Sequence, residues 1–328
     1  MEILIVKLGA AGDVVRTTAL LPGLKQKYKN VSIDWLTERP MADLLINNPN
    51  LRTVFFIDAP AEWAKRRYDL VINLDADYEV CRIIAQVPHK KLIGTYADDG
   101  KIAYTPDSAL WFDMSLLSRH GKEKADKLKL ANRRTYQNIW HEIVGLPFRG
   151  HRPHFPLADS DHRLARAFAK SHAITPRDHV IGLNTGAGNK WIHKKLSIPQ
   201  TIALLKRVRA KHPKAKFLIM GGPTEARRNA RIAHSIPHAY NATARSVKEL
   251  GALINLCSTL ITSDSLPLHI ATALEKKVVA FFSPTSPWEI ELYGNGHHVL
   301  PIHGCVACYH RKCPTTPAFN LDEMAKLV

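Results

Sequence analysis

The sequence predicts an α/β protein of two domains, each built around a parallel sheet. The first observation is alternation, since short apolar runs bounded by turn residues alternate with segments of helical spacing in both halves of the chain. The second is length, because 328 residues exceed one ordinary domain and suit two of roughly 150. The third is composition, 45% hydrophobic and 23% charged, which allows both domains to bury a core.

Five apolar runs predict the strands of the first half. They are EILIVKLG (2–9), VSIDWLTE (31–38), RTVFFID (52–58), YDLVINLDA (68–76) and KLIGTYA (91–97). The stretches 17–28 and 41–49 between them show helical spacing. A polar region rich in Lys and Arg follows, and GLPFRGHRPHFPL (145–157) has the Pro, Gly and aromatic content of a linker. We therefore expect residues 1–155 and 156–328 to form the two domains.

A second alternating set fills the remainder of the chain. Its runs are HVIGLNTGAG (179–188), KFLIMGG (216–222), TLITSDS (259–265), VVAFFSPT (278–285) and HHVLPI (297–302). Most of them end in Gly, Ser, Thr, Asp or Pro, and ligands of open α/β sheets bind beyond the carboxyl ends of the strands. Two such domains facing one another predict a ligand cleft lined by loops of both.

The loop after the first run, KLGAAGDV (7–14), contains a single acid, Asp13. Its G-x-x-G-D spacing differs from the dinucleotide pattern G-x-G-x-x-G, and a carboxylate there would repel a phosphate. This loop is therefore not a simple phosphate site, which argues against an NAD-dependent oxidoreductase.

Three stretches of the second half combine loops with polar groups. NTGAGNKWIHKKLS (184–197) places three lysines on a Gly-containing loop, which would suit a pyrophosphate. In GGPTEARR (221–228), Glu225 either stabilises a helix N-terminus or binds a ribose hydroxyl. In TSDSLPLH (262–269), Asp264 and Ser265 either cap a helix or join His269 and the hydroxyls of SPT (283–285) in a site at one sheet edge.

These motifs together resemble the heptosyltransferases of glycosyltransferase family 9. K-L-G-x-x-G-D-V comes first, followed in the same order by G-G-x-x-E, S-D-S-x-x-x-H and F-F-S-P-T-S-P. The resemblance implies a GT-B architecture of two Rossmann-like β/α/β domains facing a central cleft, with the acceptor on the first and the nucleotide-sugar on the second. It also implies inverting transfer of heptose from ADP-heptose to a lipopolysaccharide inner-core acceptor, with no cofactor required for catalysis.

The resemblance also implies roles for particular residues. Asp13 matches the proposed general base, although a simple turn residue remains the alternative, and Lys194 matches the lysine that meets the phosphates. The remaining donor-binding candidates are Thr185, Gly186, Glu225, Asp264, Ser265 and His269. The chain reads Asp264-Ser265-Leu266 where the family often has D-T-G, and Leu196-Ser197 where it often has Trp-Pro, which could reshape the donor pocket.

Two further motifs could hold metal ions. DAD (75–77) is the D-x-D pattern of metal-dependent transferases, but it lies in the first domain, and we interpret it as a strand end and turn. HGCVACYHRKCP (303–314) carries Cys305, Cys308 and Cys313, with His303 or His310 as a fourth ligand of a structural Zn or Fe. Reduced thiols on a terminal loop are the alternative.

The formal net charge of +17 predicts an anionic partner. We expect a cytoplasmic protein, peripheral at the cytoplasmic face of the inner membrane, that meets anionic lipid and a phosphorylated Kdo-lipid A acceptor. A protein, another glycan or a small molecule could replace that acceptor. A catalytically silent nucleic-acid-binding protein is the rival that charge alone supports, and no basic recognition helix favours it.

Overall fold

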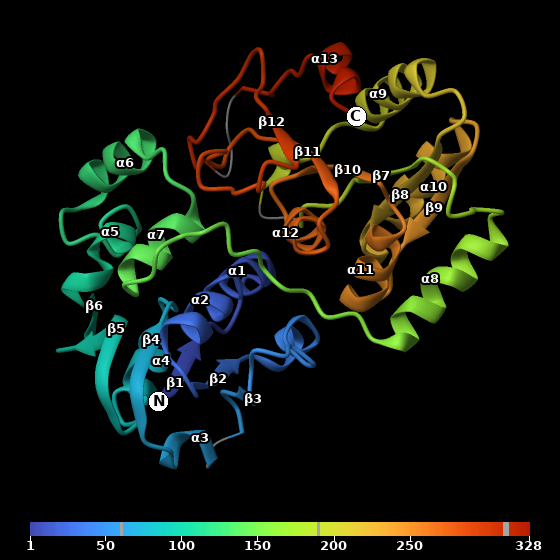
Figure 1. Ribbon diagram of the computed structural model, residues 1–328. Helices are drawn as coiled ribbons and strands as arrows, with labels where there is room; N and C mark the ends of the chain where they lie inside the picture. The colour runs from blue at the N-terminus through green and yellow to red at the C-terminus, as the bar shows by residue number, and fades with distance from the viewer. Residues whose placement is uncertain (60–61, 189–190, 311–314) are drawn as a thin grey trace. The chain divides into compact units, whose positions relative to one another are not determined.

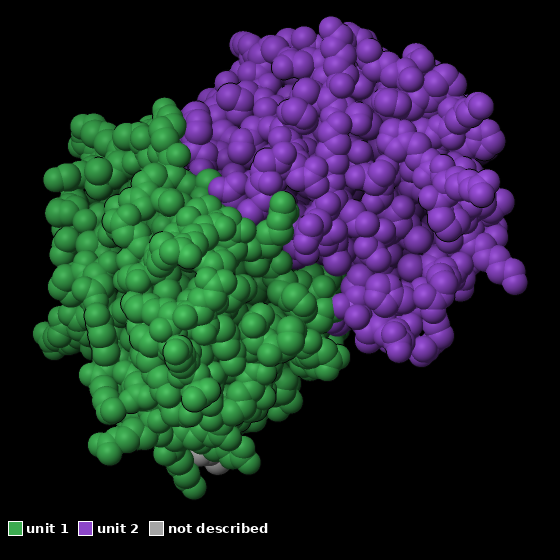
Figure 2. Space-filling model, in the orientation of Figure 1, with its two compact units in different colours: residues 1–156 green, residues 157–328 purple. Residues whose placement is uncertain are grey.

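The computed structural model describes residues 1–59, 62–188, 191–310 and 315–328. The chain divides into two compact units, unit 1 (Met1–Pro156) and unit 2 (Leu157–Val328), which Figure 2 shows in different colours. The division lies one residue beyond the boundary expected from the linker. Each unit contains its own sheet with helices around it, as Figure 1 shows. Among the described residues, no helix is long and apolar enough to cross a membrane.

The sheet of unit 1 contains the five expected strands and one more. Its strands are β1 (Glu2–Val6), β2 (Ser32–Thr37), β3 (Thr53–Phe56), β4 (Tyr68–Asn73), β5 (His89–Asp98) and β6 (Lys101–Tyr104). They lie in the order β3-β2-β1-β4-β5-β6, and only the β5–β6 pair is antiparallel. The unexpected strand β6 has four residues, too few for a recognisable period.

Helices of unit 1 lie between these strands and after the last of them. They are α1 (Ala11–Thr17), α2 (Leu20–Lys27), α3 (Glu62–Lys65), α4 (Tyr78–Ile84), α5 (Ala109–Phe112), α6 (Lys122–Ala131) and α7 (Tyr136–Ile143), with 3₁₀ turns at Arg39–Leu44 and Pro106–Ser108. The helix expected over 41–49 is one of these 3₁₀ turns. The left-handed backbone of Asn47, at φ 69°, is incompatible with a longer regular helix there.

The sheet of unit 2 is parallel throughout. Its strands are β7 (Val180–Asn184), β8 (Lys216–Gly221), β9 (Ala239–Thr243), β10 (Thr259–Ser263), β11 (Lys277–Phe281) and β12 (Gly296–Val299). They lie in the order β12-β11-β10-β7-β8-β9. The edge strand β9 was not expected, because its sequence AYNAT lacks the long apolar run of a buried strand.

Helices also surround the sheet of unit 2. They are α8 (Asp159–Ser171), α9 (Ile198–Lys211), α10 (Ala226–His234), α11 (Val247–Asn255), α12 (Leu266–Ala273) and α13 (Leu321–Lys326), with 3₁₀ turns at Ile192–Lys194 and Pro223–Glu225. The C-terminal helix α13 adds Met324 and Ala325 to a core formed by β7, β8, β11 and α9. The last residues of the chain are therefore part of the packed unit.

The two sheets share one strand order. Counted from the first strand of each unit, both run 3-2-1-4-5-6, the doubly wound order in which the winding reverses between strands 1 and 4. The reversal lies between β1 and β4 in unit 1 and between β7 and β10 in unit 2. Loops at the carboxyl ends of these four strands are therefore where each unit is expected to bind ligands.

Candidate functional site

The loop after β1 presents Asp13 at the reversal point of unit 1. Ala10 turns the chain with a left-handed φ of 58°, and α1 begins at the next residue. The Asp13 side chain does not cap this helix. Its Oδ1 accepts from Nη2 of Arg16 at 2.9 Å, and the side chain keeps 37% of its surface exposed. The carboxylate is therefore oriented by an ion pair and still reachable from solvent.

Arg16 is held in turn by aromatic rings of α5 and α7. Its guanidinium carbon lies 3.8 Å from the ring centroid of Tyr136 and 5.9 Å from that of Trp111. The same Tyr136 hydroxyl lies 2.6 Å from Oγ1 of Thr17, which donates to the Asp13 carbonyl at 2.6 Å. A cation over an aromatic face is stabilised further when it is desolvated, and Arg16 is only 8% exposed. Helix α7 therefore fixes both the side chain and the backbone around Asp13.

The DAD tripeptide serves the same loop. Asp75 follows β4, and its Oδ2 accepts from the Leu8 backbone N–H at 2.6 Å and from Nζ of Lys7 at 3.4 Å. Asp77 caps α4 by accepting from the Val80 N–H at 3.1 Å. Both carboxylates thus have structural partners, as expected for a strand end and turn.

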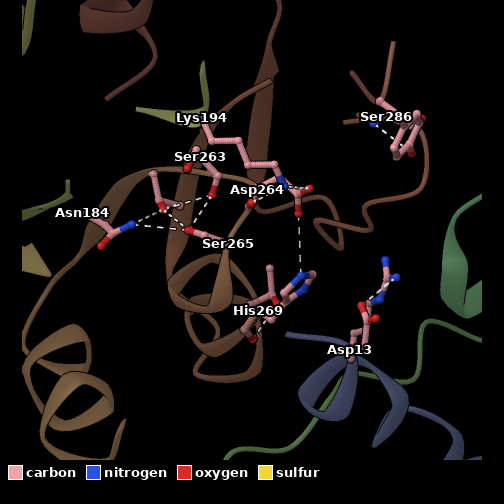
Figure 3. Close-up of polar contacts among 12 residues, drawn as sticks. Asp13, Asn184, Lys194, Ser263, Asp264, Ser265, His269 and Ser286 are labelled. Carbon is pink, nitrogen blue, oxygen red and sulfur yellow. Dashed lines mark hydrogen bonds and ion pairs between the residues drawn. The ribbon is translucent and has the colours of Figure 1, made fainter. Parts of the chain in front are cut away.

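Lys194 and Asp264 form an ion pair at the reversal point of unit 2 (Figure 3). Nζ of Lys194 donates to Oδ2 of Asp264 at 2.7 Å and to the carbonyl of the same residue at 2.8 Å. Nε2 of His269, from α12, lies 3.8 Å from Oδ1 of Asp264. The side chains of Lys194 and Asp264 are only 10% and 16% exposed. Titratable side chains of three separate segments therefore meet in a largely buried cluster.

Burial and charge act in opposite directions on Asp264. Burial raises the pKa of its carboxyl, but the positive charges of Lys194 and His269 outweigh burial and lower that pKa to about 2. The carboxylate is consequently ionised at neutral pH. The Asp264 carboxylate largely neutralises the charge of Lys194. An incoming anion therefore has to compete with Asp264 for the Lys194 ammonium group.

Asn184 joins the loops after β7 and β10. Its Nδ2 lies 3.3 Å from Oγ of Ser265, as Figure 3 shows. The same nitrogen lies 2.6 Å from the Gly186 carbonyl oxygen and 3.1 Å from Oγ1 of Thr262. Ser265 stands at the N-cap of α12, but its side chain makes no capping bond and donates to the Ser263 carbonyl at 3.2 Å. Helix capping is therefore not what the Ser265 hydroxyl does.

Thr185, Gly186 and Glu225 form the neighbouring part of this sheet edge. Thr185 is buried and donates from Oγ1 to Oδ1 of Asn229 at 2.6 Å. Glu225 accepts from the Gly222 N–H at 3.1 Å and from Nζ of Lys195 at 3.2 Å. A Cβ at Gly186 would lie 3.1 Å from the Glu225 carboxyl, so glycine permits the close approach. Glu225 thus stabilises the turn that it belongs to, and the buried Thr185 links the loop after β7 to Asn229 of α10.

The Cys-rich segment is described only in part. Cys305 and Cys308 are half-buried, and the side chains of His303 and His310 are exposed. Cys313 lies outside the described residues, so the predicted set of three thiols is not visible as a whole. Among the residues that are described, no three His, Cys, Asp or Glu side chains are grouped as a metal site.

Sequence reasoning missed the partners that orient the site. Arg16 and Tyr136 are 120 positions apart in the sequence, and Asn184 was read only as the start of a loop. Arg16 at i+3 from Asp13 was a usable signal, because helical neighbours at that spacing form ion pairs. No feature of the neighbouring sequence indicates that the Tyr136 ring packs against Arg16.

Comparisons with known proteins identify a family for this chain. The model of glycosyltransferase family 9 (heptosyltransferase) matches residues 62–318. Lipooligosaccharide heptosyltransferase 2 of Haemophilus influenzae is 24% identical over 322 residues, which cover 88% of this chain and 84% of that protein. These matches span most of the chain.

Solved structures show the same fold. The ADP-heptose lipopolysaccharide heptosyltransferase II of Escherichia coli superposes with a TM-score of 0.66 at 16% identity, covering 94% of each chain. The dodecameric iron-containing heptosyltransferase TibC, solved with ADP-D-β-D-heptose, has a TM-score of 0.52 at 13% identity and covers 94% of this chain and 65% of that one. The expected α/β architecture of the GT-B type, with two Rossmann-like units, is confirmed.

Proposed function

The chain belongs to glycosyltransferase family 9, and from that premise we propose that it transfers heptose from ADP-heptose to a lipopolysaccharide inner-core acceptor with inversion. The observation that carries the proposal is the pair of loops at the two reversal points. One presents an oriented, accessible carboxylate at Asp13, and the other gathers Lys194, Asp264 and His269. Acid–base chemistry and anion binding are thereby assigned to different units.

In the proposed reaction Asp13 acts on the acceptor. Its carboxylate takes the proton of an acceptor hydroxyl while that oxygen forms a bond to the anomeric carbon, and the bond from that carbon to the diphosphate breaks on the opposite face. The products are the glycoside, ADP and a protonated Asp13, which returns its proton to solvent. A positioned base contributes about 10²–10⁴-fold, so orientation and stabilisation of the leaving group supply the rest.

The donor is proposed to bind to unit 2. The diphosphate gains negative charge as it leaves, and Lys194 together with the backbone N–H groups of the loop at Gly186 would stabilise that charge. Asp264 and His269 would position the sugar and the ammonium group of Lys194, while Ser265, Thr185 and Glu225 would support the loops on the ribose side. This arrangement requires no metal for catalysis.

The acceptor is proposed to be a phosphorylated Kdo-lipid A type glycolipid. The net charge of +17 would draw the protein toward such an anionic acceptor and toward the membrane surface that carries it. A different acceptor of the same chemistry, such as another glycan or a protein hydroxyl, would use the same Asp13 and the same donor. A membrane-peripheral location at the cytoplasmic face follows only from the glycolipid acceptor.

A structural metal at the Cys-rich segment is also proposed. TibC is an iron-containing relative, and Cys305 and Cys308 are spaced to share one Zn or Fe ion, with Cys313 and His303 or His310 as further ligands. Elemental analysis of the purified protein is expected to give up to one equivalent of metal, lost in a variant with all three cysteines changed to Ser. Substoichiometric metal that is unchanged in this variant would make these residues ordinary thiols.

The direct test of function is a transfer assay. The protein is incubated with ADP-heptose and a Kdo-lipid A acceptor. ADP release is measured, and the mass of the product is determined by mass spectrometry. Acceptor-dependent ADP release and a product heavier by one heptosyl unit are expected. Transfer to a glycan or protein instead would identify the alternative acceptor, while failure to bind any nucleotide-sugar would contradict the proposal.

A further inference from the structure

The Cys-rich segment lies against the loop that follows β11. The backbone N–H of Ala307 donates to the Ser283 carbonyl at 3.0 Å, and that of Tyr309 donates to the Pro284 carbonyl at 2.8 Å. Oγ of Ser283 lies 3.4 Å from the Cys305 carbonyl oxygen. Residues 305–309 thus hold the loop 283–286 through three bonds before any metal is considered.

The Tyr309 side chain adds two more bonds. Its hydroxyl oxygen accepts from the Ser286 N–H at 3.2 Å, and its hydroxyl donates to Oε1 of Glu289 at 3.0 Å. Ser286 and Glu289 are both buried. The Tyr309 hydroxyl therefore holds both Ser286, at the end of the loop, and Glu289, three residues later.

This loop borders the Lys194–Asp264 pair. Strands β10 and β11 are parallel neighbours with Ser263 opposite Phe281, so Asp264–Ser265 and the loop 283–286 leave the same edge of the sheet side by side. A shift of the loop would consequently change the surroundings of Asp264.

The backbone of the segment is strained in a way that fixes Tyr309. Ala307 and Tyr309 have left-handed φ values of 56° and 52°. Such conformations are unfavourable for residues with a Cβ and persist where surrounding contacts determine them. The bonds to Ser283 and Pro284 are those contacts, and in this conformation the Tyr309 hydroxyl reaches the Ser286 N–H.

We propose that Tyr309 is a positioning residue of the donor site, which it serves by holding the loop 283–286 beside Asp264. The inference rests on the proposed function, because it takes the Lys194–Asp264 region to bind the nucleotide-sugar. It gives the Cys-rich segment a role beyond local stability, since the segment presents the phenol that orders one wall of that region.

The test is calorimetric titration of the full-length protein with ADP-heptose, needing no acceptor. Tyr309→Phe removes only the hydroxyl and is expected to raise the Kd about threefold to tenfold, the effect of one net hydrogen bond. Tyr240→Phe is the matched control, because Tyr240 lies on β9 at the opposite edge of the same sheet, and its Kd is expected to equal that of the wild type. Thermal unfolding of the unliganded variants is measured in parallel.

The outcomes separate this inference from the proposed function. A lower unfolding temperature with an unchanged Kd would make Tyr309 a structural residue and overturn the inference. If Lys194→Ala weakens binding while Tyr309→Phe matches the wild type, the donor assignment stands and only the Tyr309 inference fails. If neither the wild type nor any variant binds ADP-heptose, the donor assignment fails and this inference falls with it.

Discussion

The Asp13 loop of unit 1 and the Lys194–Asp264 cluster of unit 2 occupy equivalent places in the same strand order but treat charge in opposite ways. In unit 1 the Arg16 guanidinium is buried against aromatic rings, and the Asp13 carboxylate is partly exposed. In unit 2 both partners of the ion pair are largely buried and the cation comes from a loop. One strand order thus carries two different arrangements of charge, because topology does not fix the side chains of the segments that follow the strands.

This difference has a consequence for ligand binding. Arg16 pairs with Oδ1 of Asp13, so the second carboxylate oxygen can accept a hydrogen bond from a neutral hydroxyl while the ion pair stays intact. At the proposed donor site a phosphate would have to replace the Asp264 carboxylate beside Lys194, so donor affinity should depend on how well the ligand makes up for that lost contact. Variants at the two places should therefore separate turnover from donor binding.

The largest expected effect is at Asp13. Asp13→Ala should reduce transfer at least about 100-fold, because it removes the proposed base. It should leave ADP binding unchanged, because the nucleotide is proposed to bind to the other unit. Initial rates and calorimetry on the same preparation check both halves. A variant that keeps more than about a tenth of wild-type turnover would return Asp13 to the role of a turn residue.

The next effect is at Lys194. Lys194→Ala should weaken ADP-heptose binding about tenfold to 100-fold, since a charge-assisted hydrogen bond is lost. The unliganded protein should also be less stable, because Asp264 keeps its burial without this ammonium partner. Lys195→Ala is the comparison, and its loss should be smaller, because Lys195 pairs with Glu225. Equal losses at Lys190, Lys194 and Lys195 would indicate diffuse electrostatics instead.

Arg16 should show a smaller effect confined to turnover. Arg16→Met keeps the approximate volume but removes the charge that orients Oδ1 of Asp13, and turnover should fall about tenfold, equivalent to one hydrogen bond to a charged group. Arg16→Lys should lie between the variant and the wild type, and the Kd for ADP should be unchanged in both. Wild-type turnover in Arg16→Met would show that Asp13 needs no such orientation.

The smallest expected effect is a pH dependence that belongs to unit 1. Burial lowers the pKa of His141, on α7, to about 4, despite the opposing hydrogen bond to the Gln137 carbonyl. Between pH 4 and 6.5 the unfolded chain therefore binds a proton that the native state does not, and stability falls as the pH falls. From pH 7 to 5.5 this residue should remove about 1 kcal/mol.

Denaturant unfolding of the wild type and of His141→Gln at the two pH values measures this term. The wild type should lose more stability on acidification than the variant, while the neighbouring His151, whose pKa burial also lowers, contributes with the same sign in both proteins. Asp264, with a pKa of about 2, takes up no proton in this window. Identical pH dependence of the two proteins would refute the assignment to His141.

Much of the fold could be predicted because its strands are buried on both faces. The run Ile3–Val6 is apolar at every position, and such runs between helical segments indicate a parallel sheet. The strands β6 and β9 were missed, since both lie at a sheet edge, where short or polar sequences suffice. The prediction of a helix over 41–49 was wrong. The chain adopts a left-handed conformation at Asn47, which a regular helix does not allow, despite the helical spacing of the apolar residues.

The sequence by itself determined the class of fold, the order of the motifs and, through them, the family and the candidates Asp13 and Lys194. Burial and helical spacing are local properties, so their periods can be read from consecutive residues. Only the tertiary structure decided that Arg16 lies over Tyr136, that Lys194 pairs with Asp264, and that Tyr309 reaches Ser286. These contacts join segments that are distant in sequence, and which of them meet depends on the strand order and on how the connecting loops pack at the sheet edges.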